Sequence, residues 1–176
     1  MVEKLVNNYF PKERLITSGF NYNILGYEYN KNKYYIEIWD TSGIKSYLSL
    51  ALYQLRFANI VIYLFDLTKE ETLNEDFFYK IKENINELNH PMIYLVGNKL
   101  ELTINTDNFR KKAKELISKK VIDKYFEVSD KTGEGIEILL KNIEIDSLII
   151  TATYFPSNLN PKKKKRKKRI IVLFSE

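Results

Sequence analysis

The sequence predicts an α/β protein: a three-layer sandwich with a mostly parallel central sheet. Two observations lead to this fold class. Segments with the composition of strands alternate with segments of helical periodicity, an order that is typical of parallel sheets. Two of the strand-like segments, residues 59–66 and 91–97, are continuous apolar runs, as strands buried on both faces require.

The expected elements follow in a regular order along the chain. Residues 20–29 and 33–39 read as two strands, and the polar residues 30–32 between them predict a hairpin-like connection. Leu48, Leu52 and Leu55 recur at helical spacing, which predicts a helix at residues 46–56. Beyond these and the two apolar strands, the pattern predicts helices at residues 70–88, 106–119 and 133–146 and a strand at residues 125–129.

The composition suits one globular domain. Hydrophobic residues make up 44% and charged residues 29% of the 176 residues, which is ordinary for a globular chain. No apolar run approaches the roughly 20 residues that span a bilayer, and no secretory signal pattern opens the sequence. Because the sequence has no cysteine, it can form no disulfide, thiolate metal site or cysteine nucleophile, and we expect no prenyl or palmitoyl anchor.

Charge is concentrated near one end of the sequence. The eight residues from Lys162 to Arg169 are all positive, and subtracting them from the net charge of +5 leaves −3 on the rest. Such a run is typical of a solvated tail. We therefore expect a globular domain at residues 1–148, followed by a linker, a basic tail and an apolar segment at residues 149–176.

Three motifs follow predicted strands, in this order: Trp39-Asp40-Thr41-Ser42-Gly43, Asn98-Lys99-Leu100-Glu101 and Glu127-Val128-Ser129-Asp130-Lys131-Thr132-Gly133. They resemble the W-D-T-A-G, N-K-x-D and E-T-S-A-K motifs of Ras-superfamily small GTPases, above all the Rab branch. The resemblance covers roughly residues 4–146. It implies the G-domain fold, guanine nucleotides (GTP and GDP) and magnesium as ligands, and a role as a nucleotide-dependent switch in vesicle traffic.

The resemblance assigns the first motif to magnesium and phosphate. Asp40 matches the residue that holds magnesium through water, and Gly43 matches the glycine whose amide binds the γ-phosphate. Thr17 matches the switch I threonine that ligates magnesium. Taken alone, the first motif is equally consistent with a buried aromatic residue followed by an ordinary polar turn.

The other two motifs correspond to the guanine base. Asn98 and Lys99 match the family's residues, while Glu101 replaces an aspartate and places the carboxylate one methylene further out. In the third motif Ser129, Asp130 and Lys131 match S-A-K, whose central amide reads guanine O6 and whose lysine covers the base. The open alternatives are an exposed loop after a strand for the second motif, and a helix entry capped by Asp130 or Thr132 for the third.

Two departures from the family affect catalysis. No G-x-x-x-x-G-K-[ST] phosphate-binding loop occurs in the sequence, and Ile44 stands where the family's Gln positions the attacking water. Losing four or five charge-assisted phosphate contacts would cost on the order of 10 kcal/mol. We therefore assign no catalytic residue and expect impaired GTP binding and hydrolysis. The alternatives are a pseudo-GTPase interaction module and an N-terminally incomplete chain of an active GTPase.

Partners and location follow from the switch surfaces and the basic run. The resemblance implies effector or regulator proteins at the switches of a cytoplasmic protein. Lys162 to Arg169, after Pro161, resembles a nuclear localisation signal that an import receptor would bind. The same run is equally suited to an anionic membrane surface, at roughly 1 kcal/mol per residue, or to a solvated tail without a partner.

The last prediction concerns the sheet. In the family the first strand lies centrally, between the strands that end here at Trp39 and Asp66, and this sequence has no counterpart ahead of them. Residues 170–174, Ile-Ile-Val-Leu-Phe, have the composition of a buried parallel strand. We expect them to fill this central position, as in a circular permutation; the alternative is a frayed apolar tail.

Overall fold

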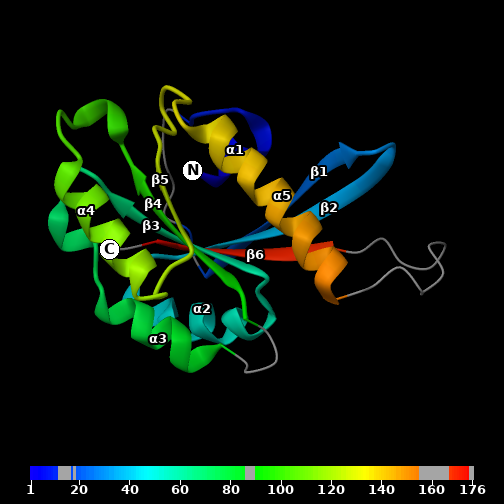
Figure 1. Ribbon diagram of the computed structural model, residues 1–176, viewed down its shortest axis with the longest axis horizontal. Coiled ribbons are helices and arrows are strands. Elements are labelled where there is room, and N and C mark those ends of the chain that lie inside the picture. Colours follow the sequence, from blue (N-terminus) through cyan, green and yellow to red (C-terminus); the bar gives the residue numbers. More distant parts are fainter. Residues whose placement is uncertain (12–16, 18, 86–89, 155–166, 175–176) are drawn as a thin grey trace.

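Six strands form one sheet in the spatial order β1-β2-β6-β3-β4-β5 (Figure 1). The computed structural model describes residues 1–11, 17, 19–85, 90–154 and 167–174. The strands are β1 (Phe20–Tyr29), β2 (Asn32–Thr41), β3 (Ile60–Asp66), β4 (Met92–Asn98), β5 (Lys124–Glu127) and β6 (Lys167–Phe174). β1 and β2 form the expected antiparallel hairpin, and all other neighbouring strands are parallel. The mostly parallel sheet is thus confirmed.

β6 occupies the central position, as predicted for residues 170–174 (Figure 1). It runs parallel to β2 and β3, with Ile170 opposite both Ile38 and Ile60. The strand begins earlier than expected, at Lys167, and therefore includes the last three residues of the basic run, residues 167–169. The start of that run, residues 162–166, lies outside the described residues.

Helices cover both faces of the sheet. α1 (Val2–Asn7) and α5 (Ile136–Tyr154) pack on one face, where Leu5 and Leu139 join Ile38, Ile60 and Ile170 in one core cluster. α2 (Leu48–Gln54), α3 (Asp76–Asn84) and α4 (Asp107–Ser118) pack on the other face through Ala51, Phe78 and Leu116. The three layers predicted from the sequence are therefore present.

The helix expected at residues 70–88 is interrupted near its start. A short 3-10 helix at Glu70–Thr72 precedes α3, which begins only at Asp76. The hydroxyl of buried Thr72 accepts from the amide of Asp66, and the Tyr63 hydroxyl donates to the Thr72 carbonyl. These contacts tie the segment to the end of β3 instead of letting one helix continue.

The last helix extends further than expected, to Tyr154 instead of Asp146. In the sequence, the charged Asp146 marks the expected end of the helix. In the structure its carboxylate is buried and accepts a hydrogen bond from the Tyr94 hydroxyl and another from Lys124 Nζ, the latter at 2.6 Å. A buried carboxylate with such partners is tolerated inside a helix. α5 continues past residue 148, where the sequence analysis places the end of the globular domain. That domain boundary stays a prediction.

Candidate functional site

A cavity of about 440 Å³ lies at the carboxyl end of β2, against the first turn of α1. It brings together four predicted site residues from three segments of the chain: Thr17, the pair Asp40 and Gly43, and Asp130. Parallel strands place the residues that follow them at one edge of a sheet, which is where ligands of open α/β folds bind. The other predicted residues, Asn98, Lys99, Glu101, Ser129 and Lys131, do not line this cavity.

Asp40 has the chemistry of a cation ligand. Its Oδ1 is buried, and among the described residues it has no hydrogen-bond partner. The pKa of this carboxyl is raised to about 6, mainly by burial; the positive chain terminus opposes the shift, and Glu3 adds to it. An unpartnered carboxylate oxygen, on a residue that lines a cavity, has the chemistry that a hard cation such as magnesium prefers.

Two further acidic residues, Glu3 and Asp130, line the cavity together with Asp40. In the parts of the chain that the structure describes, no group of three histidine, cysteine, aspartate or glutamate side chains could hold a metal ion. A cation beside Asp40 would therefore need oxygens from water, from Thr17, or from a bound phosphate. That donor set is typical of magnesium sites, which keep several water or phosphate ligands.

The loops after β4 and β5 are joined directly to each other. The side-chain Oδ1 of Asn98 accepts from the amide of Asp130 at 3.1 Å, and the amide of Leu100 donates to the Val128 carbonyl. The Asp130 amide is the group that the resemblance assigns to guanine O6. In this structure that amide already has an intramolecular acceptor.

Lys99 also has an intramolecular partner. Its backbone is left-handed (φ 66°), and its Nζ lies 2.5 Å from Asp66 Oδ2 at the end of β3. Burial opposes ionisation of Asp66, but the hydrogen bonds from Lys99 and Thr68 outweigh it and lower the pKa of this carboxyl. The sequence alone does not indicate this ion pair, because only the parallel pairing of β3 and β4 brings the two residues together.

Glu101 presents an acceptor without a donor. Its Oε2 is buried and lacks a hydrogen-bond partner among the described residues. An unsatisfied buried carboxylate oxygen is costly unless a ligand supplies a donor. Glu101 therefore fits a group that bears N–H donors, such as the edge of a guanine base.

The third motif forms a closed loop before α5. Ser129 is fully buried: its Oγ accepts from the amide of Thr132 at 3.0 Å, while Lys131 is exposed. The Asp130 carboxylate accepts from the amino group of Met1 at 3.0 Å, which the sequence did not indicate. Because α5 begins at Ile136, Asp130 and Thr132 lie too far ahead to cap it, so the helix-entry interpretation is wrong.

Gly135 closes this loop and was missed in the sequence. It has φ +72°, and a Cβ at this position would collide with the carbonyl oxygen of Glu127. Only glycine fits such a left-handed, crowded position. The signal that could have identified it is the pair of glycines, Gly133 and Gly135, directly after the motif.

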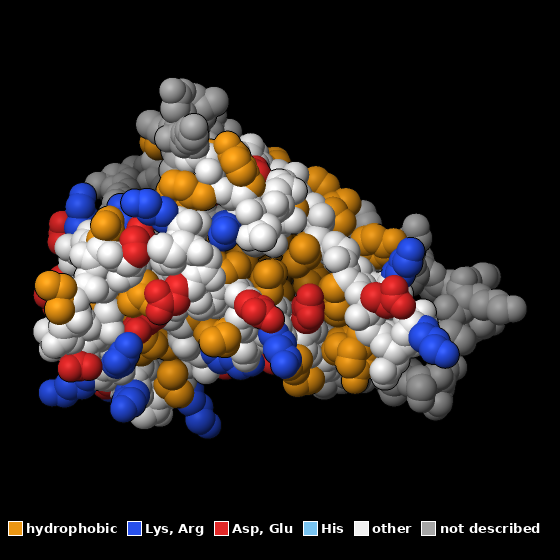
Figure 2. All heavy atoms as spheres, turned by 90° about the horizontal axis from the view of Figure 1, so that it is seen from above, with side chains coloured by type: hydrophobic (Ala, Val, Ile, Leu, Met, Phe, Trp, Pro, Cys, Tyr) orange, Lys and Arg blue, Asp and Glu red, His pale blue; other side chains and the backbone are white. Residues whose placement is uncertain are grey.

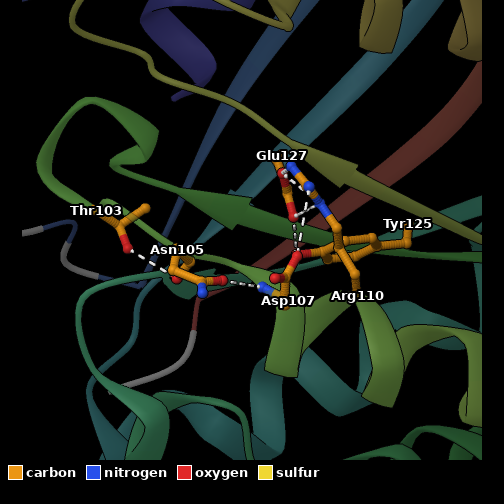
Figure 3. A network of polar contacts seen from close by, with 6 residues as sticks. All are labelled: Thr103, Asn105, Asp107, Arg110, Tyr125 and Glu127. Carbon is orange, nitrogen blue, oxygen red and sulfur yellow. Dashed lines mark hydrogen bonds and ion pairs between the residues drawn. The ribbon is translucent and has the colours of Figure 1, made fainter.

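Glu127, the first residue of the third motif, anchors β5 to α4 (Figure 3). Arg110 Nη2 lies 2.6 Å from Glu127 Oε2, and the Tyr125 hydroxyl donates to Oε1 at 2.9 Å. Burial disfavours the ionised carboxylate, but the hydrogen bonds from Arg110, Thr106 and Tyr125 outweigh it and lower the pKa of Glu127. This network holds the strand that leads into the loop at Ser129.

Ile44 follows the cavity-lining Gly43 but does not itself line the cavity. Its side chain is 42% exposed, and its amide donates to Ser42 Oγ at 3.2 Å. An aliphatic side chain has no donor or acceptor with which to orient a water molecule. The site thus offers groups for binding a cation and a polar ligand, and at Ile44 none for activating water.

Comparisons with known proteins agree with these motifs. The sequence profile of the Ras family matches residues 1–147. The Ras-related protein RabJ of Dictyostelium discoideum is 33% identical over 76% of the chain, and human Ras-related protein Rab-36 is 27% identical over 81%. The GTP-binding protein YPT53 of Saccharomyces cerevisiae is 36% identical over 57% of the chain. The chain spans 52%, 54% and 48% of these relatives, about half of their length.

Among the described residues no helix is long and apolar enough to cross a bilayer.

Proposed function

The chain belongs to the Ras family, as a Rab-like small GTPase, and we propose that it acts as a guanine-nucleotide-dependent switch in vesicle traffic with weakened nucleotide binding. One observation carries this proposal. Thr17, Asp40, Gly43 and Asp130 come from three segments of the chain and line one cavity, and the buried Oδ1 of Asp40 has no partner among the described residues. GTP or GDP and magnesium are the ligands proposed for this site.

The proposed roles follow from the donor set. Asp40 and Thr17 would hold magnesium, which supplies positive charge for the phosphates when it is bound. Gly43 would offer its backbone amide to a phosphate oxygen, and Glu101 would accept from the base. Asn98, Lys99 and the Ser129–Lys131 loop would shape the base pocket.

Weakened binding is proposed on two contacts. The Asp130 amide donates to Asn98, and Lys99 Nζ bonds to Asp66. A ligand that needs these groups must first displace their present partners, which reduces its net affinity. Weak hydrolysis is proposed because Ile44 cannot orient water.

The test is a titration of the 176-residue chain with fluorescent GTP, GDP and ATP in the presence of magnesium. We expect guanine nucleotides to bind with a dissociation constant no tighter than about micromolar, a range that corresponds to about −8 kcal/mol. Asp40→Asn should remove the dependence on magnesium, and Glu101→Asp should increase the preference for GTP over ATP. A nanomolar constant for GTP would contradict weakened binding, and no preference for guanine in either protein would contradict the switch itself.

The second candidate is an interaction module that no longer cycles between nucleotide states. It is favoured by the aromatic surface on the hairpin of β1 and β2, where Phe20 and Tyr22 are exposed and pack at 5.0 and 5.3 Å from the ring of Trp39. We propose that effectors or regulators bind this surface. If a partner captured there binds equally with and without GTP, the module is the better description; nucleotide-dependent capture supports the switch.

We propose that the protein lies in the cytoplasm, at the surface of a membrane. The basis of this proposal is the charge of residues 162–166, five consecutive Lys or Arg residues that precede β6. Import into the nucleus by the same run remains an alternative that rests on the sequence alone.

A further inference from the structure

β6 is the element that joins two parts of the sheet. β1 and β2 lie on one side of it and β3, β4 and β5 on the other, and in the described part of the chain no pairing links β2 to β3 directly. In Figure 1 the red strand runs across the centre of the sheet between these two parts. The position between β2 and β3 is therefore a slot for one parallel strand.

The slot is specific for the strand that fills it. Ile170 lies between Ile38 and Ile60 in the register, and these three side chains are 1%, 2% and 0% exposed. In the same register Tyr35 is opposite Lys167, and Glu37 is opposite Arg169. Isoleucines on both sides of the slot favour an aliphatic residue at the position of Ile170, which the sequence of this chain itself supplies.

Along the chain, β6 follows α5 after a connecting segment. Twelve residues, 155–166, separate Tyr154 from Lys167. A segment of that length can span up to about 40 Å when extended. The hydrogen bonds and side-chain contacts in the slot are the same whether β6 comes from the same chain or from another copy.

We propose that the slot between β2 and β3 accepts β6 from a second copy of this chain, so that two copies dimerise by reciprocal exchange of this strand. The partner is a second copy because it supplies the same strand with the same register and charge. The connection gives the chain's own strand an effective concentration in the millimolar range, so the closed monomer prevails in dilute solution. Exchange takes over where that strand is damaged or where copies are crowded together.

The experiment uses two full-length variants that are refolded together. Ile170→Asp places a charge in the strand and leaves the slot intact, whereas Ile38→Asp damages the slot and leaves the strand intact. Trp39 is the only tryptophan in the sequence, so adding Trp39→Phe to the Ile38→Asp chain makes the emission report on the Ile170→Asp chain alone. The control replaces the donor with a chain that carries Ile38→Asp, Trp39→Phe and Ile170→Asp together.

Alone, the Ile170→Asp chain should show the red-shifted emission of solvent-exposed Trp39. Mixed with the donor chain, it should regain the blue-shifted emission of the wild type, and light scattering should give the mass of two chains; the control chain should cause neither change. The proposal is overturned if mixing leaves the emission and mass unchanged, or if the control chain restores them equally. It is also overturned if Ile170→Asp alone is a monomer with wild-type emission, because the slot would then not require its strand.

Discussion

At the scale of single residues, the site is shaped by groups whose preferred partners lie far away in the sequence. Asp40 combines burial with an unpartnered oxygen, whereas Lys99 and the Asp130 amide are satisfied inside the protein. A buried carboxyl without a partner, such as that of Asp40, strongly influences how the stability of the protein depends on pH, because its charged form is poorly solvated.

Asp40 should make the folded state less stable as the pH rises. Its folded pKa of about 6 lies above the ordinary value of 3.8, so the folded chain holds the proton more tightly. The stabilisation is fully present below pH 3.8 and is lost as the pH rises through about 6, by about 3 kcal/mol at most. Urea unfolding of the wild type and Asp40→Asn in magnesium-free buffer at several pH values measures it. Parallel stability curves for the two proteins would contradict the raised pKa.

Gly135 should be far less tolerant of a side chain than another left-handed glycine. Gly135→Ala forces a Cβ against the Glu127 carbonyl, whereas at Gly19 (φ +78°) an added Cβ meets nothing within 4 Å. Gly19→Ala should cost about 1 to 2 kcal/mol from backbone strain alone, and Gly135→Ala should cost clearly more. Thermal and urea unfolding compare the pair. Equal losses would mean that the loop before α5 moves freely to accommodate the methyl group.

At the scale of elements, the sequence predicted well what depends on burial pattern and poorly what depends on distant partners. β3 and β4 were recognisable because strands buried on both faces are apolar throughout. The end of α5 was not predicted correctly, because a charged residue such as Asp146 is expected at the end of an apolar helix. In the structure Tyr94 and Lys124 donate hydrogen bonds to its carboxylate, which allows the helix to continue. The same holds in the site: the motifs identified Asp40 and Gly43, which line one cavity, but not the Asp66 partner of Lys99, which only the strand order supplies.

The packing of β6 predicts a large effect of a small truncation. Ile170 is 1% exposed between Ile38 and Ile60, so Ile170→Ala should lower the free energy of unfolding by about 2 to 5 kcal/mol. The matched control is Ile104→Ala, because Ile104 is fully exposed and its truncation should change stability little. Urea unfolding gives both values. A loss at Ile170 no larger than at Ile104 would place the strand outside the core.

At the scale of the whole molecule, charge and hydrophobic surface are distributed unevenly. Apart from the basic run the chain carries a net −3, and the run begins just ahead of the central strand. Figure 2 shows hydrophobic side chains reaching the surface at several places among the charged ones on the face seen from above. Electrostatic attraction to an anionic surface would thus act mainly through one short segment.

Neutralising residues 162–166 should weaken binding to anionic vesicles. At about 1 kcal/mol per basic residue, changing these five residues to Gln should reduce partitioning onto phosphatidylserine vesicles by on the order of a thousandfold at low salt. The matched control changes five exposed lysines elsewhere to Gln: Lys69, Lys80, Lys111, Lys114 and Lys120. Vesicle sedimentation at two salt concentrations measures both variants. Equal losses would indicate a diffuse charge effect rather than a segment that binds the membrane.

The central place of β6 also has a consequence for synthesis on the ribosome. β2 ends at Thr41 and β3 at Asp66, yet the strand that pairs with both ends at Phe174. At about 5 to 20 residues per second, the ribosome needs on the order of ten seconds to translate from the end of β2 to the end of β6. During that interval the nascent chain displays two unpaired parallel edges, the kind of surface that chaperones shield. The complete sheet of this protein can therefore form only after β6 has left the exit tunnel.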